Sequence, residues 1–121
     1  MLKHILTIDD EDPIRELLAE LLEVLNYRVT GVSSGADALR VIANDPPDLI
    51  ITDLQLEESD GLEFIEKFKD ILPNVPVILL TGMLFDSRVV EESIKSKVSA
   101  YVPKTTPLSE LSKVIHGLLN D

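Results

Sequence analysis

Short apolar runs alternate with longer stretches of helical periodicity along the whole chain. The five runs have the lengths typical of strands; the second is the weakest of them, and the third is typical of a strand buried on both faces. They cover residues 5–8, 27–32, 48–53, 77–81 and 100–102. Apolar residues at helical spacing follow each run, which predicts helices beginning near residues 12, 34, 61, 87 and 106.

Several helix boundaries carry residues that suit helix ends. Asp12 is expected to cap the first helix, Pro13 suits its first turn, and Asn26 can close it. Ser34, followed three residues later by Asp37, resembles the capping box that opens a helix. These signals support the boundaries that the apolar periodicity indicates.

Five alternations of strand and helix predict an α/β fold with one parallel sheet and helices on both faces. The 121 residues are enough for one hydrophobic core and too few for two comfortable domains. We therefore expect a single domain over residues 1–121.

Composition and charge narrow the possible functions. The chain has no cysteine, which excludes disulfides, a thiol nucleophile and cysteine-ligated metals. Its net charge of −11 argues against direct binding to nucleic acid or to a membrane surface, and favours a metal cation or a basic protein face as partner. No apolar run approaches the roughly 18 residues of a membrane span, and the N-terminus does not resemble a signal peptide. A cytoplasmic location is the expectation.

Polar side chains follow the apolar runs at the points where the strands end. Asp9 and Asp10 follow the first run, Asp53 ends the third, and Thr81 and Lys104 stand at the ends of the fourth and fifth. Ligands bind at the carboxyl edge of open parallel sheets. We therefore expect these residues to converge on one site, with Asp53 at its centre.

Two interpretations of the acidic residues stay open. Clustered carboxylates repel one another unless a cation lies among them, and Mg²⁺ suits a site with oxygen ligands. The alternative is a set of solvated acids at strand ends. Helix capping explains Asp12 and extends to Glu11, because acids are favoured at a helix N-terminus, but it does not explain Asp9 and Asp10.

Thr81 and Lys104 indicate a function only in combination with the acids expected beside them. Taken singly, they are an ordinary β-branched strand residue and a surface lysine. Together with a cation and a carboxylate nucleophile, a hydroxyl and an ammonium form a set suited to phosphoryl transfer. The two histidines, His4 and His116, are expected to be structural.

Six motifs combine these residues in a fixed order. They are Ile8-Asp9-Asp10-Glu11, Ile14-Arg15, Ser34-Gly35 with Ala38-Leu39, Asp53-Leu54 with Asp60-Gly61-Leu62, Leu80-Thr81-Gly82, and Tyr101-Val102-Pro103-Lys104. In order and spacing they resemble the CheY-like receiver domains of two-component response regulators, over essentially the whole chain. The resemblance implies a doubly wound (βα)5 flavodoxin-like fold with five parallel strands in the order 2-1-3-4-5.

The resemblance also implies roles for the site residues. Asp53 would be the phosphoacceptor, attacking a phosphohistidine of a sensor histidine kinase or a histidine phosphotransfer protein. Asp10 and Asp53 would bind Mg²⁺ directly, with the backbone carbonyl of Gln55, and Asp9 would bind it through a water. Lys104 would pair with the phosphoryl group.

The family resemblance also implies a conformational switch. Thr81 would move to hydrogen-bond the phosphoryl group and Tyr101 would change rotamer with it, remodelling the face of the fourth helix, fifth strand and fifth helix. The chain would be a signalling phosphoacceptor, not an enzyme, catalysing only its own phosphorylation and slow dephosphorylation. Charges of both signs on that face are consistent with homodimerisation through it. They are Arg88, Glu91, Lys95, Glu110 and Lys113.

The chain departs from the family pattern at a few positions. Thr105 replaces the usual proline after Lys104, and we expect a trans peptide there because a cis bond before a non-proline residue costs roughly 2.5–4 kcal/mol. Glu57 and Glu58 are expected to slow reaction with anionic phosphodonors. Lys97 stands where glycine is usual.

Two further positions concern dephosphorylation. Gln55 and Met83 lie two residues beyond Asp53 and Thr81, where the family tunes the attack of water on the phosphoryl group. Met83 offers no acid or amide to orient that water, which predicts slow dephosphorylation.

Other functions compete with this interpretation. A pseudo-receiver would use the fold for docking or dimerisation without phosphorylation; Thr105 favours it, and the complete set of acids, Thr81 and Lys104 opposes it. An aspartyl phosphatase would need a carboxylate at Gln55, and a flavin-binding domain would need a Gly, Ser and Thr phosphate cradle after the first strand.

Overall fold

Five parallel strands form a central sheet in the computed structural model, which describes residues 2–56, 59–82 and 88–120. The strands are β1 (His4–Ile8), β2 (Arg28–Val32), β3 (Leu49–Thr52), β6 (Val77–Thr81) and β7 (Ala100–Pro103). Their spatial order is β2-β1-β3-β6-β7. Counted along the chain these strands have the order 2-1-3-4-5, which confirms the predicted fold.

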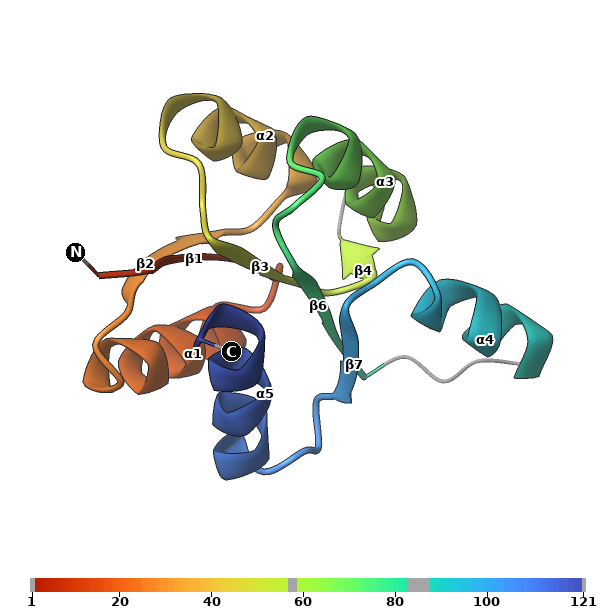
Figure 1. Ribbon diagram of the computed structural model, residues 1–121. Helices are drawn as coiled ribbons and strands as arrows, with labels where there is room; N and C mark the ends of the chain where they lie inside the picture. Colours follow the sequence, from red (N-terminus) through yellow and green to blue (C-terminus); the bar gives the residue numbers. More distant parts are fainter. Residues whose placement is uncertain (1, 57–58, 83–87, 121) are drawn as a thin grey trace.

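Helices cover both faces of this sheet (Figure 1). They are α1 (Asp12–Val24), α2 (Gly35–Asn44), α3 (Gly61–Ile71), α4 (Arg88–Lys95) and α5 (Leu108–Asn120). Helices α1 and α5 lie on one face, and α2, α3 and α4 contribute to the core on the other. None of the helices in the described ranges is long and apolar enough to cross a membrane.

The central strand explains why the sheet has two cores. Ile50 belongs to the core beneath α2 and α3, whereas Leu49 and Ile51 belong to the core beneath α1 and α5. Successive side chains of a strand point to opposite faces, so a strand buried on both faces needs an uninterrupted apolar run. That requirement is why the apolar runs predicted the strands so closely.

One pair of strands had no counterpart in the sequence pattern. The two-residue strands β4 (Gln55–Leu56) and β5 (Ser59–Asp60) pair antiparallel directly after the central strand. Two residues per strand are too few to show the alternation that predicts a strand.

The ends of the first two helices show which capping predictions were right. Asn26 has a φ of 68° and closes α1, where the amide of Tyr27 donates to the carbonyl of Leu22 at 3.0 Å. Ser34 caps α2 and accepts a hydrogen bond from the amide of Asp37 at 3.2 Å. Both predictions are confirmed.

The capping prediction for α1 was wrong. Glu11, not Asp12, is the N-cap residue, and it makes no side-chain cap hydrogen bond. Asp12 lies in the first turn, where its carboxylate pairs with Arg15. An acid in the first turn is favoured by the helix dipole even without a cap bond, so the two positions are easily confused in sequence.

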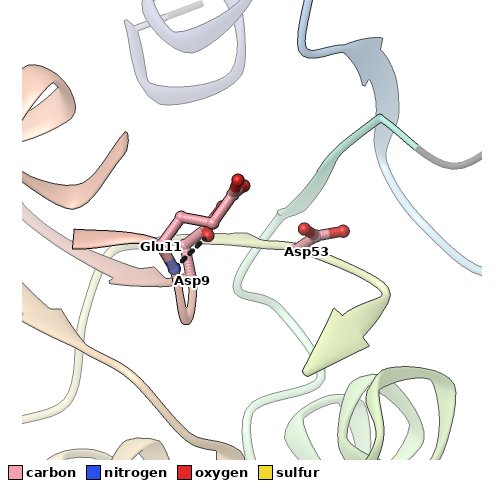
Figure 2. Close-up of side chains that lie close together, drawn as sticks. All are labelled: Asp9, Glu11 and Asp53. Carbon is pink, nitrogen blue, oxygen red and sulfur yellow. Dashed lines mark hydrogen bonds between the residues drawn. The ribbon is translucent and has the colours of Figure 1, made fainter. Parts of the chain in front are cut away.

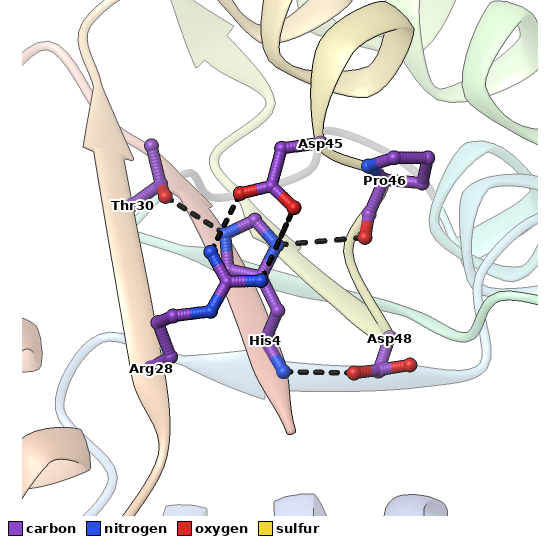
Figure 3. Close-up of polar contacts among 6 residues, drawn as sticks. All are labelled: His4, Arg28, Thr30, Asp45, Pro46 and Asp48. Carbon is purple, nitrogen blue, oxygen red and sulfur yellow. Dashed lines mark hydrogen bonds and ion pairs between the residues drawn. The ribbon is translucent and has the colours of Figure 1, made fainter. Parts of the chain in front are cut away.

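The amino-terminal edge of the sheet is joined by a polar network around His4 (Figure 3). The imidazole is buried, with Nε2 2.7 Å from the hydroxyl of Thr30. The backbone amide of His4 donates to the carboxylate of Asp48 at 2.8 Å. Arg28 pairs with Asp45 above the ring at 2.5 Å, and its hydrogen bond lowers the pKa of that carboxyl. These contacts connect β1 to β2 and to the loop before β3, a structural role for His4.

Gly61 allows a close approach that a larger residue would prevent. A Cβ at this first residue of α3 would lie 2.3 Å from the carbonyl oxygen of Leu54. We predict that Gly61→Ala lowers the free energy of unfolding by about 1–3 kcal/mol, because the backbone next to Asp53 must shift. Urea denaturation followed by circular dichroism measures this change.

Gly117 provides the matched control. It lies within α5, and a Cβ added there would have no atom within 4 Å apart from its chain neighbours and the adjacent backbone of its own helix, so alanine finds no obstacle. Gly117→Ala should stabilise the protein by roughly 0.5–1 kcal/mol through helix propensity. Equal effects of the two substitutions would refute the close-approach explanation.

Candidate functional site

The register of the two central strands brings the first two acids together. Ile8 of β1 lies opposite Thr52 of β3, so the residues that follow them, Asp9 and Asp53, are neighbours at the carboxyl edge. The amide of Asp53 donates to the carbonyl of Ile8 at 3.1 Å and holds this alignment. Their side chains are only 3% and 4% exposed. The sheet thus fixes two carboxylates in a poorly solvated position.

Lys104 reaches this pair from the end of β7. Its amide donates to the carbonyl of Thr81 at 3.0 Å, which places the residue beside β6. Its Nζ lies 2.7 Å from Asp53 Oδ2 and 3.1 Å from Asp9 Oδ2. Peptide bonds in the described ranges are all trans, so the prediction for the bond before Thr105 is confirmed. The departure at Thr105 does not keep Lys104 from Asp53.

Glu11 is the site residue that the sequence reasoning missed, because helix capping is the role that its position predicts. Its carboxylate Oε2 lies 2.5 Å from Lys104 Nζ, and its amide donates to Asp9 Oδ1 at 2.9 Å. Oxygens of Asp9, Glu11 and Asp53 all lie within 4.8 Å of one another, and Figure 2 shows their three side chains together. The available signal was its position in the acidic run at the carboxyl edge.

The other predicted residues surround this centre. Asp10 is half-buried and lines a pocket of about 410 Å³ with Glu11, Asp53, Gly82 and Lys104. Within the described ranges, it does not join the three converging carboxylates.

Thr81 is buried at the end of β6, and Tyr101 is half-buried in β7. Lys95 Nζ of α4 lies 4.9 Å from the centroid of the Tyr101 ring. The backbone of Gln55 pairs with Asp60 in the β4–β5 ribbon. Met83, like Glu57 and Glu58, lies outside the described residues.

Burial and ion pairing set the charges of the site. Desolvation raises the pKa of Asp9, although the amide of Glu11 and the ammonium of Lys104 oppose the rise. Burial disfavours the charged form of Lys104, but hydrogen bonds to Asp53, Glu11 and Asp9 outweigh it and raise the pKa. Lys104 is therefore an ammonium at neutral pH and the counter-ion of the carboxylates.

The donor set fits a hard divalent cation. One ammonium does not balance the carboxylates around it, and burial, which raises the pKa of Asp9, makes further positive charge favourable there. Oxygen donors at a pocket that keeps room for water match the ligands that Mg²⁺ prefers.

A doubly wound sheet with acids, a threonine and a lysine at its carboxyl edge defines the class of the protein. Residues 5–116 match the family model of the response regulator receiver domain. The chain belongs to this family and is a receiver domain of two-component signalling.

Relatives with known names agree with this assignment. Response regulator protein VraR of Staphylococcus saprophyticus is 33% identical over 119 residues, which are 97% of this chain and 56% of VraR. Response regulator MprA of Mycobacterium leprae is 31% identical over 116 residues, covering 96% of this chain and 50% of MprA. The chain thus spans about half the length of these relatives.

Solved structures show the same fold. Response regulator protein TrrA of Thermotoga maritima, in complex with Mg²⁺-BeF, superimposes with a TM-score of 0.86 at 30% identity, covering 98% of this chain and 100% of TrrA. A response regulator receiver domain protein from Clostridium thermocellum gives a TM-score of 0.84 at 29% identity, covering 98% and 95%.

The raised pKa of Asp9 has a consequence for stability. A carboxyl with a raised pKa binds its proton more tightly in the folded state, so ionisation destabilises the fold as pH rises above about 3.9, the value of an unfolded aspartate. Asparagine has no such ionisation. We therefore predict that Asp9→Asn is more resistant to urea than the wild type at pH 7, in metal-free buffer.

The pH dependence provides the check. The advantage of Asp9→Asn over the wild type should shrink as the pH is lowered toward and below about 3.9, because protonation makes the Asp9 side chain neutral, as asparagine already is. A wild type more stable than Asp9→Asn at pH 7 without metal would show that the pair with Lys104 outweighs the cost of burial.

Proposed function

We propose that Asp53 is the phosphoacceptor of this receiver domain and takes its phosphoryl group from a phosphohistidine of a sensor histidine kinase or histidine phosphotransfer protein. The observation that carries the proposal is the contact of its buried carboxylate with Lys104, 2.7 Å away, at the floor of an open pocket. A nucleophile paired with a cation at a sheet edge suits attack on an anionic phosphoryl group.

The reaction exchanges one bond to phosphorus for another. An oxygen of Asp53 attacks, the O–P bond forms, the P–N bond of the donor breaks, and its electron pair stays on the imidazole nitrogen. Lys104, which lies beside Asp53, pairs with the new phosphoryl oxygens and neutralises their charge. The hydroxyl of Thr81, at the end of the neighbouring strand β6, donates to another phosphoryl oxygen.

Mg²⁺ would complete the charge balance. Asp10, Asp53 and the backbone carbonyl of Gln55 would hold it directly, and Asp9 would hold it through a water. When bound, the cation supplies positive charge to the phosphoryl oxygens. TrrA, 30% identical to this chain, has been solved with Mg²⁺-BeF, which supports Mg²⁺ as the cation.

Thr81 and Tyr101 would change conformation in response to the phosphoryl group. Movement of Thr81 toward it would free space for Tyr101, and the face of α4, β7 and α5 would change. The Lys95 ammonium over the Tyr101 ring connects α4 to this switch. Homodimerisation through the same face is also part of the proposal. In the structure, Glu91 forms an ion pair with Lys95 within α4, and Glu110 forms one with Lys113 within α5.

Slow dephosphorylation is also part of the proposal, because Met83 offers no acid or amide that could orient the attacking water. The pseudo-receiver alternative is less well supported, since the lysine contact with Asp53 is intact despite Thr105. We further propose that residues 1–121 act as a single receiver domain.

Beryllofluoride, a phosphoryl mimic, tests the acceptor. With Mg²⁺ it should shift the amide NMR signals of Thr81, Tyr101 and Lys104 in the wild type, and Asp53→Asn should lose the response completely because it lacks the second carboxylate oxygen. Asp70→Asn is the matched control, since Asp70 is exposed in α3. Its spectrum should respond as the wild type does.

An unchanged wild-type spectrum at saturating Mg²⁺ and mimic would reject the phosphoacceptor proposal and favour the pseudo-receiver. A response that persists in Asp53→Asn would mean that another group binds the mimic.

A further inference from the structure

Lys104 has an exposed partner as well as two buried ones. In the described part of the chain its Nζ contacts Asp9, Glu11 and Asp53, and the contact with Glu11 is the shortest at 2.5 Å. The side chain of Glu11 is 57% exposed, whereas Asp9 and Asp53 are almost fully buried. The phosphoryl transfer proposed for Asp53 gives no role to Glu11.

The backbone of Glu11 is held on both sides while its side chain can swing. Its amide donates to Asp9 Oδ1, and its carbonyl accepts from the amides of Ile14 and Arg15 in the first turn of α1. The carboxylate lines the same pocket as Asp53 and Lys104. Glu11 is thus anchored at the pocket rim, with its charge free to leave Lys104 for solvent.

An ammonium has three N–H donors, and the three carboxylates around Lys104 are enough to use them all. An incoming phosphoryl group must therefore displace one of these partners to bind Lys104. Leaving a buried carboxylate unpaired is costly, whereas an exposed carboxylate is solvated at once. Glu11 is the partner that costs least to displace.

We propose that Glu11 restrains Lys104 and competes with the phosphoryl group for its ammonium, which makes Glu11 a positioning residue of the site. This inference rests on the proposed phosphoacceptor role of Asp53. The restraint stabilises the unphosphorylated state and weakens the binding of small anionic donors, because each must exchange with a carboxylate already in place.

The test compares two variants that each remove one negative charge at adjacent positions. Glu11→Gln keeps the shape of the side chain and removes the ion pair with Lys104. Asp12→Asn is the control, because the Asp12 carboxylate pairs with Arg15 and is not among the carboxylates that contact Lys104 in the described part of the chain. Beryllofluoride is titrated into each protein at saturating Mg²⁺, with the Thr81 amide signal as the readout.

We expect Glu11→Gln to bind beryllofluoride about twofold to fivefold more tightly than the wild type, the effect of an ion pair with one exposed partner. Asp12→Asn should bind as the wild type does. Equal affinities of the two variants, or weaker binding by Glu11→Gln, would overturn the restraint.

A second measurement separates the restraint from metal binding. Glu11 could instead be a Mg²⁺ ligand with Asp9 and Asp53, since their oxygens lie within 4.8 Å. In that case Glu11→Gln would lose about tenfold or more in Mg²⁺ affinity without the mimic, since even the loss of an outer-shell partner costs about that much, and the inference would be wrong. Mg²⁺ affinity close to that of Asp12→Asn supports it.

The ion pair itself is tested without metal or mimic. The urea midpoints of Glu11→Gln, Lys104→Met and the double variant should be non-additive, since the contact exists only when both residues are present. Additive midpoints would overturn the inference.

The outcomes for the two proposals can be told apart. If the wild type fails to bind the mimic, both the Asp53 proposal and the competition by Glu11 are refuted. If the wild type binds the mimic and Glu11→Gln gains no affinity, only the Glu11 restraint is refuted.

Discussion

The ammonium of Lys104 among the carboxylates is the interaction on which the site depends. Asp9 and Asp53 are buried side by side, and without a cation their charges would repel one another in a poorly solvated place. Lys104 lies within 3.1 Å of both and supplies the nearest positive charge in the described structure. The same contact poises the site for a reaction in which new negative charge arrives on a phosphoryl group.

The pairing of the strands in the sheet produces this arrangement. Parallel pairing of β1 with β3, and of β6 with β7, brings four strand ends to one edge. The two cores then bury the strands from both sides, so the edge cannot rearrange without disturbing the apolar residues behind it. Gly61 adds a backbone contact beside Asp53 that fixes where α3 begins. Rigid strands thus carry the reacting groups, and the loops around them complete the pocket.

Much of this could be predicted from sequence because the signals are local. The apolar run of β3 and the helix-ending Asn26 each depend on neighbouring residues only. The convergence of Asp9 and Asp53 followed from their positions at the ends of parallel strands, whose carboxyl edge brings such residues together. The features that were missed or predicted wrongly also have physical explanations. The role of Glu11 depends on a contact with Lys104, 93 residues away, and no local pattern reports such a contact. Asp12 was chosen as the cap because acids suit both the cap and the first turn. The β4–β5 ribbon is too short and too polar to produce a periodic signal.

Direct chemical mapping of the acceptor is the sharpest test of the role of Asp53. The protein is incubated with phosphoramidate and Mg²⁺, treated with borohydride to reduce any acyl phosphate to an alcohol, and sequenced by peptide mass spectrometry. An aspartyl phosphate becomes homoserine in this treatment. We predict homoserine at position 53, dependent on Mg²⁺. A reduced side chain at Asp9, Asp10 or Glu11 instead, or none at any acidic residue, would contradict the assignment.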